Sequence, residues 1–446
     1  MPVYFSCEVS KREVLPRLFL AGHLARQGIG SVVGHKTLLP SLLGSAPKGV
    51  FLYKSVTPIC ARHYQLASSF GHLNFGLCEE LLFFKKEEDQ TWDKQISPDT
   101  LGLLDVYLAS NSFDYQKATE AIGARAHLTG NIRLDFARNC ARALYSNLSE
   151  SLRERYGKFC LIVSPAMIFS TPWTVTRELN NIKSRISEQA KANPFGLLDF
   201  IKWSVDRSSG YLQQMRLVLE ILQSASTLPL IRPHPGEDRD FYNNLFLSTI
   251  NTAWDYDIYP WILSASAIVN YDCTTTLDAA LLGRRALNLS QEHMSSETFG
   301  QALDIPFSRG YLDLFLSDQS GRTDPLMSDA NLESAFNGML PFGDSIRKNI
   351  TSHISGCHAE RDGERFAKWA RIVSKKLTGM KPLTDQLEPS LAQRWIYSQS
   401  NPSLAELGRH AVEIGFRNAL GNRDSSNSTV DFNNIGDDLF FVVPSS

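Results

Sequence analysis

The sequence predicts an α/β protein of two domains, each built on a parallel sheet. The chain of 446 residues is longer than one hydrophobic core usually organises. Short apolar runs alternate with helical patterns from the start of the chain, which is typical of parallel βαβ units. The alternation begins afresh with the apolar run FCLIVS at 159–164, after a polar helical stretch. We therefore expect the domain boundary at residue 150.

The elements follow from hydrophobic periodicity. In the first domain we expect strands at 3–8, 31–35, 49–53, 72–78, 105–110 and 126–130, with helices at 12–27 and 114–123. In the second, 151–375, we expect strands at 159–164, 228–232, 267–271 and 286–289, with helices at 259–265 and 275–282. C-terminal helices are expected over 376–420. Residues 421–446 are polar and predict a mobile tail, in which the apolar run LFFVV could dock.

Composition excludes several classes of function. Lys plus Arg number 45 against 47 for Asp plus Glu, so no global field attracts nucleic acid. The seven cysteines form no CxxC pair of the kind that zinc sites use, which favours reduced thiols and no bound metal. No apolar run is long enough to span a membrane, and we expect a cytoplasmic protein. The segment 11–30 could touch the inner membrane surface, or pack on the core.

The segment after residues 228–232 is the most informative one. Pro233 and Pro235 stiffen a turn that carries Arg232 and His234 at the carboxyl end of a strand. Ligands of open α/β sheets bind at that edge. Arg and protonated His both donate hydrogen bonds to phosphate, so the turn predicts a nucleotide site. The alternative is a proline-rich turn whose His caps the next helix.

A second segment, 267–283, runs from a strand into three successive threonines that open a helix. Thr274, Thr275 and Thr276 add hydroxyl groups to the unpaired N–H groups of the first helical turn. The positive end of the helix dipole lies there too, so this turn readily receives a phosphate or carboxylate. Capping by a single Thr is the common alternative. The threonines and the Arg-Pro-His-Pro turn together favour a shared site.

These two segments resemble the donor-site motifs of the bacterial surface-carbohydrate biosynthesis family of GT-B glycosyltransferases, relatives of Kdo and CMP-nonulosonate transferases. The resemblance implies two Rossmann-type domains facing a central cleft, with C-terminal helices crossing back. It implies an acceptor-binding domain over 1–150 and a CMP-sugar domain over 151–375. Trp261 fits the family pattern, and Ser164 is a weak match that could donate to a phosphate. The residues so implied to hold CMP are Arg232, His234, Pro235, Ser164, Cys273, Thr274, Thr275, Thr276 and Asp278.

The string TGNIRLD at 129–135 extends the resemblance. It is similar to a Thr-Gly-Asn-Pro-Arg-Phe-Asp motif of the family, with Ile132 in place of proline. The resemblance implies that Asn131 and Arg133 donate hydrogen bonds to the anionic sugar or its phosphate. A local ion pair between Arg133 and Asp135 at a helix start is the alternative.

Near the N-terminus, Glu8, Arg12 and Glu13 are similar to a Glu followed by an Arg-Glu pair in relatives. A carboxylate at the end of the first strand could accept the proton of an attacking hydroxyl, or pair with Arg12. His35 and Lys36 resemble a Gly-His-Lys string that implies the acceptor side, although His35 equally suits a core role.

The resemblance implies a metal-independent and cofactor-free transferase. It would move an acidic 3-deoxy-ulosonic sugar, either Kdo or a nonulosonic acid, from CMP to a hydroxyl of a capsule, O-antigen or lipopolysaccharide. Glu8, Asp135 and His234 are the catalytic candidates, and a carboxylate nucleophile in a retaining mechanism could be Asp135, Glu237, Asp238 or Asp272. The alternatives are a CDP-polyol phosphotransferase, a nucleotide-sugar epimerase of the same architecture, and a non-catalytic scaffold subunit.

Overall fold

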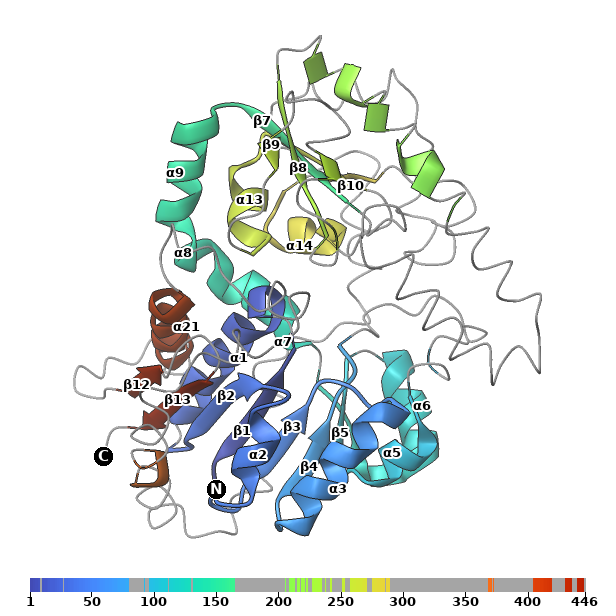
Figure 1. Ribbon diagram of the computed structural model, residues 1–446, viewed down its shortest axis with the longest axis vertical. Coiled ribbons are helices and arrows are strands. Elements are labelled where there is room, and N and C mark those ends of the chain that lie inside the picture. Colours follow the sequence, from blue (N-terminus) through green and yellow to red (C-terminus); the bar gives the residue numbers. More distant parts are fainter. Residues whose placement is uncertain are drawn as a thin grey trace. The chain divides into compact units, whose positions relative to one another are not determined.

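The computed structural model forms two compact units, Met1–Leu144 with Ser334–Ser446, and Tyr145–Glu333 (Figure 1). The sequence predicts a boundary at 150, which lies inside helix α9 (Ser146–Tyr156). The structure describes residues 1–8, 10–26, 28–79, 92, 96–110, 112–129, 131–164, 205, 208–212, 215–216, 218–220, 222–223, 227–234, 237, 241–242, 251–252, 257–270, 275–284, 286–288, 368–370, 372, 404–418, 430–434 and 439–444.

The first unit is built on one sheet with the strand order β12-β13-β2-β1-β3-β4-β5-β6. From β2 to β6 all neighbours pair in parallel. The strands are β1 (Val3–Cys7), β2 (Ser31–His35), β3 (Val50–Tyr53), β4 (Leu73–Gly76), β5 (Val106–Ala109) and β6 (Ala126–Leu128). The helices are α1 (Ser10–Ala25), α2 (Leu39–Leu43), η1 (Pro58–Cys60), α3 (Ala61–Ser69), α5 (Pro98–Gly102), α6 (Ser112–Ile122), η2 (Gly123–Arg125), α7 (Ile132–Phe136), a π-helical turn (Ala137–Ala141) and α8 (Arg142–Leu144).

Helices cover both faces of this sheet, as a parallel sheet requires. Successive strand residues point to opposite faces. Tyr4 and Phe51 belong to a core that includes residues of α2, α3, α5 and α6. Phe5 and Leu52 face α1 and α7 instead. The apolar side chains of α1 are buried, so this helix packs on the core. Core packing was one of the two predictions for the segment 11–30, the other being contact with a membrane surface.

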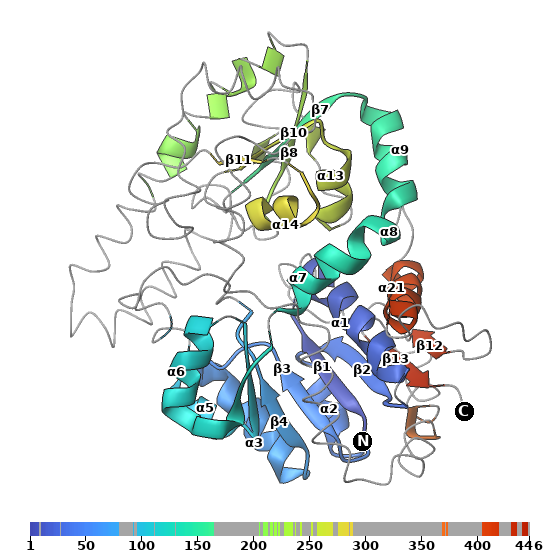
Figure 2. The same ribbon diagram turned by 180° about the vertical axis from the view of Figure 1, so that it is seen from behind.

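The chain returns to the first unit at its C-terminal end, as the fold class predicts. Helix α21 (Leu404–Asn418) lies against α1 in both views (Figures 1 and 2). The helices approach so closely that a Cβ on Gly22 would lie 2.1 Å from the carbonyl oxygen of Val412. Only glycine fits at that crossing. The guanidinium of Arg26 lies 5.4 Å from the ring centre of Phe416 and adds a cation–π contact.

Within the predicted mobile tail at 421–446 the structure describes 430–434 and 439–444, and these residues form strands. Strands β12 (Val430–Asn434) and β13 (Leu439–Pro444) form an antiparallel hairpin, and β13 pairs with β2. The apolar run LFFVV is buried in β13. The physical reason is that β2 would otherwise be the sheet edge, with unpaired N–H and C=O groups that favour strand addition.

The second unit holds a parallel sheet with the order β11-β10-β7-β8-β9. When the five strands are numbered in chain order and the sheet is read from β9 to β11, their order is 3-2-1-4-5, the Rossmann arrangement. The predicted class of two Rossmann-type α/β units is thus confirmed. Trp261 packs between Tyr156 and Phe159, with ring centres 5.7 and 6.2 Å apart. The remaining elements are β7 (Phe159–Val163), β8 (Leu228–Arg232), β9 (Asn251–Thr252), α13 (Tyr259–Ser264), β10 (Ala267–Asn270), α14 (Thr275–Leu281) and β11 (Leu287–Asn288).

None of the helices that the structure describes combines the length and apolar character that a membrane crossing requires. The cysteines in the described part of the chain are buried and free of disulfides: Cys7, Cys60, Cys78, Cys140 and Cys160.

Candidate functional site

Three strand ends of the second unit meet at one edge. Strand β7 lies between β8 and β10, and its last residue, Val163, pairs with both Arg232 and Asn270. The strands are parallel, so their carboxyl ends are level. The chain leaves β7 toward β8 on one side and returns to β10 on the other. This edge is therefore the topological switch point, where open α/β sheets bind ligands.

A buried carboxylate, Glu237, fastens the turn after β8. Its Oε2 accepts a hydrogen bond of 2.6 Å from the backbone N–H of His234. Its Oε1 accepts from the Ser164 hydroxyl at 2.7 Å and from the Tyr242 hydroxyl at 3.1 Å. Burial raises the pKa of Tyr242, so the phenol stays a neutral donor. Glu237 thus joins the end of β7 to the turn that presents His234, which is itself exposed.

A second buried carboxyl, Asp257, interacts with both sides of this edge. Its oxygens accept hydrogen bonds from the Tyr145 hydroxyl and, at 3.0 Å, from the Tyr259 N–H. Burial raises the pKa of Asp257 to about 7, the charge of Arg232 opposes that rise, and the charge of Asp278 adds to it. Asp257 therefore lies within electrostatic range of both Arg232, at the end of β8, and Asp278, in α14.

The raised pKa of Asp257 gives a pH dependence of stability. Its ordinary value is 3.8 and its folded value about 7, so the folded state binds the proton more tightly. The stability that this provides is present at low pH and is lost as pH rises through about 7. We expect Asp257→Asn, which cannot ionise, to gain stability relative to the parent protein as pH rises. Urea unfolding of both proteins from about pH 4 to about pH 8 measures this, and parallel profiles would contradict it.

Charged residues meet at the corresponding edge of the first unit. Glu8 follows β1, Lys36 follows β2 and Lys54 follows β3, and β1 lies between the other two strands. The carboxylate of Glu8 contacts the ammonium of Lys36 at 2.7 Å and that of Lys54 at 2.8 Å. The side chains of Glu8 and Lys36 are 22% and 28% exposed, so a ligand can reach them. This edge is also a switch point, between β1 and β3.

Glu13 holds this cluster from within the core. Its carboxylate, which is 0% exposed, accepts from Lys54 at 2.9 Å and from Arg12 at 3.2 Å. Its second oxygen accepts from the backbone N–H of Glu8 at 2.6 Å. Burial alone would raise the pKa of Glu13, but Lys54, Arg17 and Arg12 outweigh burial and hold the pKa far below its ordinary range.

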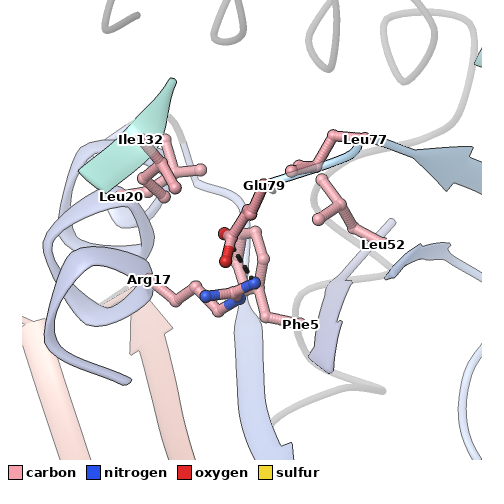
Figure 3. Close-up of a pocket in the computed structure, with 7 residues that line it drawn as sticks. All are labelled: Phe5, Arg17, Leu20, Leu52, Leu77, Glu79 and Ile132. Atoms are coloured by element: carbon pink, nitrogen blue, oxygen red, sulfur yellow. Dashed lines mark hydrogen bonds and ion pairs between the residues drawn. The ribbon is translucent and has the colours of Figure 1, made fainter. Parts of the chain in front are cut away.

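Next to this cluster, the buried guanidinium of Arg17 forms an ion pair with the carboxylate of Glu79 at 2.8 Å (Figure 3). Burial would lower the pKa of Arg17, but Glu79 outweighs it and the pKa is raised. Apolar side chains surround the pair, namely Phe5, Leu20, Leu52, Leu77 and Ile132, and they leave no room for a water-sized molecule.

Two residues implied to bind substrate have local hydrogen-bond partners, and their role toward substrate stays a prediction. His35 is buried, and its Nδ1 lies 2.8 Å from the Thr37 hydroxyl. Burial, with a smaller effect of Lys36, lowers the pKa of His35 to about 4, so the ring is neutral near pH 7. The side-chain oxygen of Asn131 accepts from the Arg133 N–H at 2.9 Å at the start of α7, as a helix cap does.

The remaining predicted residues divide into three groups. Arg232, Thr275 and Asp278 are buried, and they lie at the carboxyl edge of the second sheet with Ser164. The backbones of Asp135 and Thr276 lie in α7 and α14, and their side chains lie outside the described residues. Also outside the described residues are Pro235, Asp238, Asp272, Cys273 and Thr274.

Sequence reasoning missed Lys54, Arg17, Glu79 and His63. Lys54 comes directly after a buried strand, the same signal that marks Glu8. His63 stacks on Tyr53 with ring centres 5.1 Å apart, and no motif surrounds it. Within the described part of the chain, no group of three or more His, Cys, Asp and Glu side chains could hold a metal ion.

No protein-family model matches the sequence, and a search of curated proteins finds no match. Among solved structures, UDP-GlcNAc 2-epimerase of Methanocaldococcus jannaschii in complex with UDP-GlcNAc and UDP is 10% identical over 79% of this chain and 100% of that one, with a TM-score of 0.49. A putative UDP-N-acetylglucosamine 2-epimerase from Listeria monocytogenes is 10% identical over 80% and 98%, with a TM-score of 0.46. The wall teichoic acid polymerase TagF is 9% identical over 80% and 89%, with a TM-score of 0.45.

Proposed function

We propose that the chain is a glycosyltransferase that moves an acidic 3-deoxy-ulosonic sugar from a CMP donor to a hydroxyl of a bacterial surface glycan. The proposal rests on one observation, the pairing of the strands: Arg232 of β8 and Asn270 of β10 are both paired with Val163 of β7. This register supports the proposal because it brings Arg232 and Asn270 to one switch point, where a nucleotide is expected.

In this proposal the second unit binds CMP. The acceptor's hydroxyl oxygen bonds to the sugar's anomeric carbon as the bond from that carbon to the phosphate oxygen breaks. The electron pair of the broken bond stays on CMP, which gains negative charge, and the hydroxyl proton passes to water. Arg232 and His234 donate to that charge from a turn that Glu237 already holds in place. Preorganised donors of this kind stabilise a developing charge without reorganising during the reaction.

The first unit binds the acceptor in this proposal. Burial would raise the pKa of Glu8, but Lys54 and Lys36 outweigh burial and lower the pKa to about 2. General-base catalysis works best with a pKa near the working pH, so such a carboxylate is a weak base. We therefore assign Glu8 to accepting a hydrogen bond from the acceptor and Lys36 to binding an anionic group on it.

The test is ligand-dependent thermal stabilisation. CMP should raise the melting temperature more than UMP or AMP does. A bound ligand stabilises the folded protein by mass action, by roughly 2.7 kcal/mol when its concentration is about 100 times its Kd. His234→Ala should weaken CMP binding about tenfold or more, in line with loss of a charge-assisted donor. Its unliganded melting temperature should stay unchanged, because His234 is exposed and Glu237 binds its backbone N–H.

His410→Ala is the matched control, since His410 is exposed on α21 in the first unit. It should leave CMP binding unchanged. Incubation with CMP-Kdo, CMP-sialate and CDP-glycerol then separates the reactions. Consumption of CDP-glycerol indicates a polyol phosphotransferase, product without an acceptor indicates an epimerase, and no affinity for any cytidine nucleotide indicates a scaffold subunit. Each of these three results would overturn the proposal.

A further inference from the structure

The first unit contains a long segment without any acidic residue. From residue 14 to residue 78 the chain has no Asp or Glu, and its cations are Arg17, Arg26, Lys36, Lys48, Lys54 and Arg62. Arg17, Lys36 and Lys54 are paired with carboxylates that lie outside this segment. Lys48 and Arg62 are exposed on the α2 and α3 side of the sheet. Lys48 and Arg62 therefore place positive charge beside α2 and α3.

Three large apolar side chains are exposed along the same side. Ile59 is 76% exposed, Leu66 37% and Phe70 41%. They lie in η1, in α3 and directly after α3, at spacings of seven and four residues. Such spacings place side chains on one side of a helix. These three form an apolar stripe, while the Tyr64 and Ala67 side chains of α3 are buried in the core.

The cations flank this apolar stripe. Arg62 comes three residues after Ile59 and four before Leu66, which places it beside both. At the far end, a Cβ on Gly71 would lie 3.3 Å from the ammonium of Lys48, so this charge is next to the turn after Phe70. The Phe70 ring lies against Gly44 after α2, where an added Cβ would be 3.0 Å away. The stripe and its cations thus form one continuous surface.

We propose that this surface, made of Ile59, Leu66, Phe70, Arg62 and Lys48, docks the protein onto a membrane that contains anionic lipid. Exposed apolar side chains enter the boundary between headgroups and acyl chains, and nearby Lys and Arg are attracted to anionic headgroups. A second copy of the chain fits less well, because a two-fold interface would bring the same cations against each other.

The experiment is flotation of the full chain with vesicles of phosphatidylcholine alone or mixed with phosphatidylglycerol. We expect binding to the mixed vesicles, and its loss at high salt because salt screens the attraction. Combined replacement of Ile59, Leu66 and Phe70 by serine should reduce binding about tenfold or more. Combined replacement of Lys48 and Arg62 by glutamine should abolish the preference for phosphatidylglycerol.

Tyr115→Ser and Ile372→Ser are matched controls, because these side chains are 37% and 45% exposed elsewhere on the first unit and should not affect flotation. All variants should keep the CMP-induced rise in melting temperature, so failure of docking is distinct from failure of the proposed function. Equal flotation of the triple serine variant and the parent would overturn the proposal. So would a parent protein that floats with neither vesicle, or one that self-associates through this stripe in light scattering.

Discussion

Replacing Glu13 with alanine is expected to lower the free energy of unfolding by about 3–5 kcal/mol, the range for breaking a buried ion pair. Lys54 would lose its contact at 2.9 Å and the Glu8 N–H its acceptor at 2.6 Å. Lys54 is only 7% exposed, so water does not readily replace the lost partner. Glu8 alone would then neutralise it.

Urea unfolding of Glu13→Ala and of the double variant with Lys54→Met measures this effect. Removing both charges leaves no buried charge unpaired, so the double variant should recover part of the loss. Glu220→Ala is the control, because it breaks an exposed pair with Arg216 at 3.2 Å and should cost only about 0–1 kcal/mol. Equal losses in Glu13→Ala and Glu220→Ala would refute a central role for this network.

Changing Glu237 to glutamine is expected to weaken CMP binding by more than about tenfold and to destabilise the second unit by roughly 2–3 kcal/mol. Both oxygens of Glu237 accept from donors: the His234 N–H on one side, and the Ser164 and Tyr242 hydroxyls on the other. An amide offers only one acceptor oxygen. Its NH₂ group would face either the fixed N–H of His234 or the two hydroxyls, which would have to turn.

Calorimetric titration with CMP and urea unfolding together test this result. Tyr242→Phe is the matched variant, because it removes one donor and leaves the bonds from Ser164 and His234. We expect it to cost about 1 kcal/mol and to change CMP affinity little. If Glu237→Gln loses stability but binds CMP as tightly as the parent protein, the turn after β8 is not part of the nucleotide site.

Strands buried on both faces were predictable from the sequence. The pattern predicts strands at 228–232 and 267–271, and the structure has β8 at Leu228–Arg232 and β10 at Ala267–Asn270. Continuous apolar runs of this kind are typical of parallel sheets. The adjacency of β8 and β10 to β7 follows from topology, so the meeting of their carboxyl ends could be inferred as well. The sequence therefore indicates the candidate edge of the second unit.

Contacts between distant residues could not be predicted. Arg17 and Glu79 are 62 residues apart, and neither belongs to a motif. Strand β13 was missed for a related reason, because its pairing depends on the unpaired edge of β2 and not on the polar residues that precede it. The oxygen of Asn131 caps a helix, while the ligand contact that its motif implies for the amide NH₂ group stays a prediction.

The pairing of β13 with β2 also sets an order of events during synthesis. The first unit needs residues near 440 to complete a sheet that begins at residue 3, so the edge of β2 stays open until those residues have left the ribosome. The second unit, within 145–333, precedes them along the chain and can fold first. Until β13 is made, the nascent chain exposes an unpaired edge strand, and in that period a chaperone would protect it from aggregation.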